Sequence, residues 1–182
     1  MNEVKLPADV EFHEDIRLLI YRPHGVLNEQ SVDKIVGIIR ELESKLQEPF
    51  NRFFDTCGHD EVELNYQYVI QVSLYRVLSY ADRPPVKSAI LATDSTIGHY
   101  FQLHAIITED SPINVRIFQQ REDASKWLVR ANRAAGSEIR RRLNVRPKHN
   151  QAEVSRVNGE NSSFSLTACA TIRPTDETGS RR

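Results

Sequence analysis

The stretch PPVKSAILATDSTIGHYFQLHAIITEDSPINVRIF, residues 84–118, decides the fold. It opens with a continuous apolar run over 86–92, and it closes with INVRIF, 113–118, in which apolar and polar residues alternate as in a strand. Between these runs, Ser95 begins a segment whose apolar residues recur at helical spacing. Strand, helix and strand in this order are typical of a parallel sheet with helices packed on it.

The preceding residues extend the same pattern. Two short β-prone runs, 10–13 and 16–21, predict a hairpin that opens the chain. Asn28 is a good helix N-cap, and apolar residues at helical spacing predict one long helix between it and Pro49. Residues 50–55 then predict a buried strand that leads into a polar loop.

A further helix is expected after Asn65, and Pro84 ends it. Its predicted inward residues are Tyr66, Val69, Ile70, Ser73, Val77 and Leu78. A last helix carries Trp127. We therefore predict one α/β domain over 8–132, a mixed and mostly parallel sheet that is opened by an N-terminal hairpin and flanked by about four helices.

The hydrophobic pattern stops after residue 132. Residues 133–146 form a basic extension that can make one short helix. Residues 147–182 contain few apolar residues, so we expect a mostly disordered, flexible C-terminal tail, because so little burial cannot offset the entropy of ordering the chain. The domain is accordingly expected to fold without the residues that follow Gly136.

Composition excludes several classes of protein. The 182 residues are 40% hydrophobic and 27% charged, which is enough apolar material for a core. No apolar run is long enough to span a membrane or to act as a secretory signal, so we expect a cytoplasmic protein. The two cysteines, Cys57 and Cys169, form no CxxC pair, and we expect no metal and no cofactor.

Charge is divided unevenly along the chain. Residues 1–120 hold 11 Lys/Arg and 18 Asp/Glu, whereas residues 121–182 hold 13 and 7. A basic cluster is prominent in the second part, and it comprises Arg140, Arg141, Arg142, Arg146 and Lys148. We predict that this cluster binds an acidic partner or docks on the acidic domain itself. Nucleic acid is a weaker alternative, because no nucleic-acid-binding motif accompanies the cluster.

Five strings in this order resemble a STAS domain, the fold of anti-sigma-factor antagonists and of the cytoplasmic tails of sulfate transporters. The strings are RPHGVL (22–27), PFNRFFDTCG (49–58), PPVKSAILA (84–92), EDSPINVRIF (109–118) and WL (127–128). The chain is most similar to a bacterial branch described as STAS-like or sporulation stage II protein AA-like. This resemblance implies a mixed sheet flanked by helices, and a role in binding or regulation rather than in turnover.

The sequence departs from that family at its regulatory serine. In phospho-regulated antagonists, the serine lies at the start of the helix that follows the strand corresponding to 50–55. Here the matching stretch is HDEVELNYQY, with no serine or threonine between Gly58 and Tyr68. We therefore expect this protein to lack the phosphoserine switch, although Tyr66 remains a hydroxyl that could be modified.

Polar side chains crowd the loop after the strand at 50–55, where open α/β sheets tend to bind ligands. They are Asp55, Cys57, His59, Asp60, Glu61 and Glu63. We predict that this loop binds a protein partner or a small ligand. Two alternatives are considered: a nucleophilic Cys57 activated by His59, and a metal site, for which this spacing provides no fixed ligand geometry.

The sequence therefore favours a non-catalytic binding or regulatory module. The alternative function is a carrier that holds a small molecule or lipid between the sheet and the helices. An enzyme ranks third, because no complete catalytic constellation and no phosphate-binding glycine loop are visible. His104 falls on the apolar face of its helix, which predicts a buried histidine bonded to a neighbour.

Overall fold

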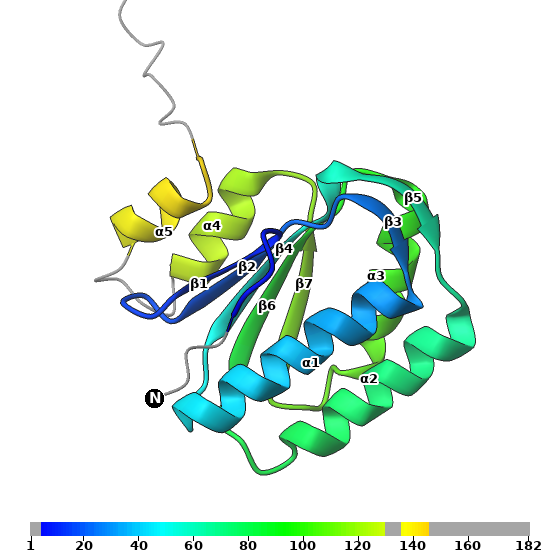
Figure 1. Ribbon diagram of the computed structural model, residues 1–182, viewed down its shortest axis with the longest axis horizontal. Helices are drawn as coiled ribbons and strands as arrows, with labels where there is room; N and C mark the ends of the chain where they lie inside the picture. Colours follow the sequence, from blue (N-terminus) through cyan, green and yellow to red (C-terminus); the bar gives the residue numbers. More distant parts are fainter. Residues whose placement is uncertain (1–4, 130–135, 146–182) are drawn as a thin grey trace, which may run out of the picture. The chain divides into compact units, whose positions relative to one another are not determined.

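The computed structural model describes residues 5–129 and 136–145 of the chain (Figure 1). The expected tail 147–182, together with Arg146 and Lys148, lies outside the described residues. The elements, in chain order, are β1 (Val10–His13), β2 (Leu18–Tyr21), β3 (Gly25–Asn28), α1 (Glu29–Leu46), β4 (Asn51–Asp55), the 3-10 helix η1 (Thr56–Gly58), β5 (His59–Glu63), α2 (Tyr66–Tyr80), β6 (Val86–Leu91), α3 (Ser95–Ile107), β7 (Ile113–Phe118), α4 (Arg121–Val129) and α5 (Gly136–Arg142).

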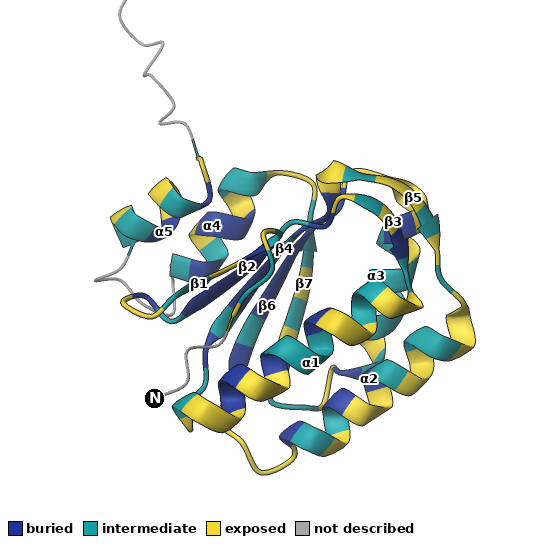
Figure 2. Cartoon of the chain, in the orientation of Figure 1, coloured by how far each residue is buried: buried dark blue, intermediate teal, exposed yellow. Residues whose placement is uncertain are grey.

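The main sheet has five strands in the order β1-β2-β4-β6-β7. Strands β1 and β2 form the expected antiparallel hairpin, and the β2–β4, β4–β6 and β6–β7 pairs are all parallel. This arrangement confirms the predicted α/β class with a mixed, mostly parallel sheet. Figure 2 shows the buried residues concentrated on the central strands. Strand β7 forms one edge of the sheet.

Helices cover both faces of the sheet (Figure 1). Because side chains alternate along a strand, Leu18, Ile20 and Phe53 face one way and pack against α4 and α5. Leu19 and Tyr21 face the other way and pack against α1. On that same face, Ile90 packs with residues of α3.

Helix α1 begins with a reciprocal cap. The Asn28 side chain accepts from the Ser31 N–H, and Ser31 Oγ accepts from the Asn28 N–H at 3.0 Å. At its other end, Gln47 closes the helix in the left-handed region with φ 52°. The predicted N-cap and the predicted end before Pro49 are both confirmed, and the apolar face of α1 buries Ile35 and Ile39 as expected.

The prediction of a polar loop after β4 is wrong in part. Residues 56–58 form η1, and residues 59–63 form β5, which pairs in parallel with β3 in a separate two-stranded sheet. The sequence of β5 hides this strand because HDEVE has only one apolar residue, Val62, which packs inward. Its neighbours Asp60, Glu61 and Glu63 are exposed.

The inward face of α2 also differs from the prediction. Tyr66, Ile70 and Leu78 were expected inside, yet their exposed fractions are 54%, 37% and 78%. The buried residues of α2 are Ser73, Arg76 and Tyr80. Apolar residues occur all around this helix, so their spacing alone does not fix which side faces the sheet. The buried residues Arg76 and Tyr80 contact a polar cluster on α1 and β4, which is described below.

The packed core reaches beyond residue 132. Ile139 of α5 and Leu143 are 2% and 0% exposed, and both belong to the cluster that contains Leu128 of α4. Burial at these two positions argues that residues after Gly136 contribute to the core, and the expectation that the domain folds without them stays a prediction. The signal that sequence reasoning overlooked is the four-residue spacing of these two apolar residues within the basic run.

In the described residues, no helix combines the length and the apolar character that crossing a membrane requires. The cytoplasmic location stays a prediction.

Candidate functional site

Strands β4 and β6 are parallel, so Asp55 and Leu91 end at the same edge of the sheet, and the predicted loop starts there. Asp55 itself is buried. Its Oδ2 accepts from Arg121 Nη2 at 2.5 Å and lies 4.0 Å from Arg22 Nε. This carboxylate therefore ties the start of α4 to the end of β4, and little of it is exposed.

Cys57 is exposed, and Thr93 Oγ1 donates to its Sγ at 3.7 Å. Desolvation is the main cause that raises the pKa of the Cys57 thiol. His59 bonds through Nδ1 to the carbonyl oxygen of Thr56, and no hydrogen bond joins His59 to Cys57, both of which are described. The arrangement gives no support to a Cys57–His59 nucleophile.

The rest of the predicted loop is an acidic strand surface. Asp60, Glu61 and Glu63 lie exposed on β5. Within the described part of the chain, no group of three or more His, Cys, Asp or Glu side chains has the arrangement of a metal site. Of the six predicted site residues, Cys57, His59, Asp60, Glu61 and Glu63 remain available to a partner at least in part, and Asp55 is largely buried.

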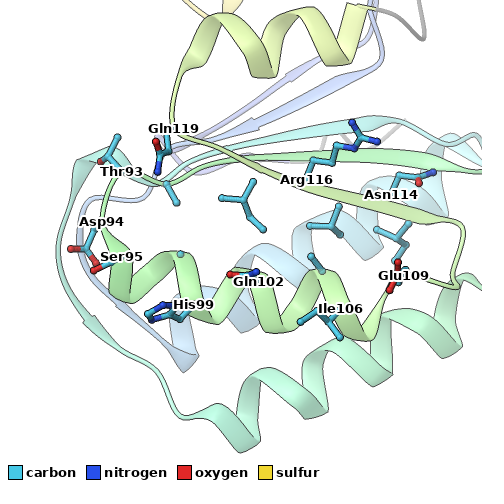
Figure 3. Close-up of a pocket in the computed structure, with 16 residues that line it drawn as sticks. Thr93, Asp94, Ser95, His99, Gln102, Ile106, Glu109, Asn114, Arg116 and Gln119 are labelled. Atoms are coloured by element: carbon cyan, nitrogen blue, oxygen red, sulfur yellow. The ribbon is translucent and has the colours of Figure 1, made fainter.

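A groove of about 720 Å³ begins beside this loop and runs along α3 and β7 (Figure 3). Its end near the loop is formed by Thr93, Asp94 and Ser95, and Thr93 is the residue that touches Cys57. Further along, α3 contributes Gly98, Gln102 and Ala105, and β7 contributes 113–117. The groove therefore connects the predicted loop to the edge of the main sheet.

The side of the groove formed by α3 contains small residues. Asp94 caps α3, its Oδ1 accepting from the N–H groups of Thr96 at 2.8 Å and Ile97 at 3.1 Å, and these bonds lower the pKa of Asp94. One turn later, a Cβ placed on Gly98 would meet no atom within 4 Å. Small residues at Gly98 and Ala105 thus leave the space beside β7 open.

The strand wall of the groove is the outer edge of β7. Alternate residues of a strand point to opposite faces, so a groove that touches all of 113–117 must follow the strand edge. The carbonyl oxygens of Pro112 and Phe118 accept from the N–H groups of Val86 and Ala92, so these even-numbered residues direct their backbone groups toward β6. Because the direction alternates along a strand, the backbone groups of Val115 and Ile117 point away from β6. Among the described strands, none pairs with β7 on that side.

A second cavity, of about 100 Å³, lies between the main sheet and helices α1, α2 and α3. Its walls are mostly apolar. The charged or hydrogen-bonding side chains that line it include Arg52, Ser73, Arg76, Ser88 and His104. Arg52 lies on the central strand β4, and its register partner on β6 is Ser88. Polar groups therefore occupy the middle of the sheet on its α1–α3 face.

Two guanidinium groups beside this cavity share one carboxylate. Glu43 Oε1 accepts from Arg52 Nη2 at 2.6 Å and from Arg76 Nη2 at 3.2 Å, and all three side chains are at most 6% exposed. The Tyr80 hydroxyl also bonds to Glu43 and to Arg52. Arg83 Nη1 lies 3.4 Å from Glu43 Oε2 at the exposed side of the cluster. Burial, followed by the nearby Arg76, lowers the pKa of Arg52 to about 10.

His104, predicted to be buried and bonded to a neighbour, lies half-buried next to this cluster. Its Nδ1 is 2.8 Å from Ser73 Oγ, which itself donates to the Val69 carbonyl. Burial first, and then the charges of Arg76 and Arg52, lower the pKa of His104 to about 4. The imidazole is therefore neutral at physiological pH.

Sequence reasoning missed Glu43, Arg52 and Arg76. A signal was present, because Glu43 follows Ile35 and Ile39 at four-residue steps on the apolar face of α1, and Arg52 interrupts an apolar strand. A charged residue in such a position is buried, and a buried charge needs a partner.

The described residues of the basic cluster lie on the short helix α5, which also carries the acidic residue Glu138. Glu138 accepts from Arg141 Nε at 2.7 Å and from Arg142 Nε at 2.5 Å, and these bonds lower the pKa of Glu138 to about 2. Arg140 is exposed. Two of the three consecutive arginines are thus paired within α5, and docking of the whole cluster on the domain remains a prediction.

Comparison with family models gives no match, and comparison with curated protein sequences gives none. Among solved structures, the chain is similar to one described as an uncharacterized protein from the DUF3478 family with a SpoIIAA-like fold, from Shewanella loihica PV-4. The two share 15% sequence identity with a TM-score of 0.44, over 65% of this chain and 90% of the other.

Proposed function

We propose that this protein is a binding module whose groove between α3 and the open edge of β7 accepts an extended segment of a protein partner. The observation that carries the proposal is the outer edge of β7, which lies along a groove and pairs with no other strand among the described residues. Backbone N–H and C=O groups alternate along such an edge, and another extended backbone satisfies them best.

The groove also sets what the segment would look like. Strand β7 is six residues long, so a partner strand of similar length would pair with it. Side chains on one face of that strand would lie over Gly98 and Ala105, where small or apolar residues fit. Side chains on its other face would lie near Arg116, which favours an acidic residue there.

The predicted loop becomes the rim of this binding surface. Thr93 belongs to the groove and contacts Cys57, so a partner segment that continues past the end of β7 would meet Cys57 and His59. The exposed acids Asp60, Glu61 and Glu63 would add contacts to basic groups of the partner. On this proposal, the loop is a partner-binding region that works without a phosphoserine switch.

The carrier alternative is less favoured for a lipid. The cavity between sheet and helices is about 100 Å³, whereas pockets that enclose drug-sized ligands measure about 300–1,000 Å³. A lipid chain would have to displace α1 or α2. No complete catalytic constellation joins the described groove residues, so we propose binding without turnover.

A peptide-display selection tests the proposal. Random extended peptides are selected on the intact protein and counter-selected on Gly98→Leu, whose Cβ would meet no atom within 4 Å and whose longer side chain would extend into the groove. Gly37→Leu is the matched control, since Gly37 also lies within a helix and a Cβ added there would meet no atom within 4 Å. We expect peptides with alternating apolar and polar residues that bind at least tenfold more weakly to Gly98→Leu and normally to Gly37→Leu. Peptides that bind both variants equally would contradict the proposal.

A further inference from the structure

We propose that the cavity between the main sheet and helices α1, α2 and α3 is a binding site for a small aliphatic monocarboxylate, with Arg52 and Arg76 as its anion-binding residues. This site is separate from the groove along β7. It does not rest on the proposed function, and either can hold if the other fails.

Charge is the first observation. Arg52 and Arg76 are 2% and 4% exposed, and both use the same carboxylate oxygen of Glu43. Arg83 adds a third cation at the exposed side of Glu43. Within this described cluster, one acid therefore faces at least two buried cations. A buried charge without a counter-charge is costly, and one bound anion would balance the excess.

Hydrogen bonding is the second observation. Arg52 Nη2 bonds to both Glu43 and Tyr80, whereas Arg52 Nε is buried and has no hydrogen-bond partner in the described structure. A free guanidinium donor on a residue that lines a cavity is what a carboxylate oxygen would occupy. Ser73 and Ser88, which also line the cavity, add hydroxyl groups close to the same region.

The walls and the size restrict the ligand. Most of the cavity surface comes from side chains such as Ile35, Ile39, Ile90 and Phe101, which favour an aliphatic body. An apolar cavity of about 150 Å³ holds benzene, so the smaller space here suits a ligand shorter than about seven heavy atoms. A single excess charge matches a monocarboxylate better than a dianionic phosphate. Butyrate and its close homologues meet these requirements.

A route to the cavity lies between α1 and α2. An outer groove of about 390 Å³ between these helices shares Val36, Tyr68 and Val72 with the cavity lining. The Tyr68 hydroxyl shares its one proton between Asp33 Oδ1 at 2.7 Å and the Glu29 carbonyl at 2.9 Å, and this contact joins α2 to α1. The shared side chains stand between the two spaces, so a small ligand would enter by moving Tyr68.

The test compares butyrate with butyramide, which has the same shape and no charge. Both are titrated at millimolar concentration into the intact protein while the His104 ring is followed by NMR. Because Arg52 and Arg76 act on His104, an anion beside them should raise its pKa. At pH 7, where butyrate is ionised, we expect butyrate to shift the His104 ring resonances and to raise the melting temperature, and butyramide to do neither.

Two variants test whether butyrate binding depends on Arg52. Arg52→Met leaves Arg76 as the one buried arginine beside Glu43 and should weaken butyrate binding at least tenfold. Arg116→Met, a substitution on β7 away from the cavity, should leave binding unchanged. If Arg52→Met fails to fold, the acid–amide comparison on the unaltered protein decides alone. Equal effects of butyrate and butyramide, or no change at His104 with either, would overturn the proposal and leave a water molecule as the occupant of the cavity.

Discussion

His104 lies beside two buried guanidinium groups, and this neighbourhood gives its titration a consequence for stability. The pKa of about 4 in the folded protein is below the ordinary value of 6.5 that the unfolded chain has. Between these values, the unfolded chain binds a proton that the folded protein does not bind. Stability therefore rises with pH through this window, and it is lost as the pH falls from about 6.5 toward 4.

We expect His104 to contribute a loss of up to about 3 kcal/mol in the unfolding free energy across that window. Urea unfolding at several pH values, compared between the protein and His104→Gln, measures this contribution, because all other titrating groups are common to both. The unfolding free energy of the unaltered protein minus that of His104→Gln should decrease as the pH falls. A constant difference from pH 7 to pH 4 would show that His104 titrates normally.

Cys57 is the residue on which the nucleophile alternative depends. Its side chain is exposed, so access does not limit its reactivity, but desolvation raises its thiol pKa. We expect iodoacetamide to alkylate Cys57 more slowly at pH 8 in the native protein than in the urea-unfolded chain, as read by mass spectrometry of the Cys57 peptide. Faster alkylation in the native protein would indicate an activated thiolate and would revive an enzymatic role.

At the scale of the element, α5 is the segment whose importance the sequence understated. Ile139 and Leu143 are buried against the α4 side of the sheet. Each such residue typically contributes about 2–5 kcal/mol when its side chain is buried. A chain that ends at residue 136 should therefore melt at least about 10 °C lower than the full chain.

The matched control is a chain that ends at residue 146, which keeps both side chains. Its melting temperature should stay close to that of the full chain, as followed by circular dichroism at 222 nm or by calorimetry. If the chain that ends at 136 melts with the full chain, α5 contributes little to the core and the boundary near 132 is restored.

Elements with strong local signals could be predicted from the sequence. Helix α1 has a capping residue and one apolar face, and β6 is a continuous apolar run, so both were predicted near their observed bounds. Strand β5 could not be predicted because only Val62 among its residues packs inward. The orientation of α2 depends on Glu43 of another helix, and local periodicity contains no information about such a contact.

The same distinction applies to the candidate sites. The polar loop at the end of β4 was visible because polar residues gather in one short segment. The groove depends on β7 being at the sheet edge, which is a property of strand order, and the cavity cluster joins Glu43, Arg52 and Arg76 from three elements. Residues that meet only after folding leave separate and weak traces in the sequence.

At the scale of the whole described domain, α3 is a wall common to both proposed sites. Phe101 and His104 face the cavity, whereas Gly98 and Gln102 face the groove. The cavity is mostly apolar and lined by two buried arginines, and the groove is more open and follows a strand edge. These properties suit different occupants: a small anion inside, and an extended protein segment outside.

The central claim is that β7 offers a free edge for strand pairing, and amide hydrogen exchange in the intact protein tests it most directly. By alternation, the N–H groups of Asn114 and Arg116 point to β6, and those of Val115 and Ile117 point into the groove. We predict slow exchange for the first pair and fast exchange for the second, with the second pair becoming slow when a selected peptide binds. Slow exchange at all four amides in the free protein, or no change at Val115 and Ile117 on binding, would contradict the account.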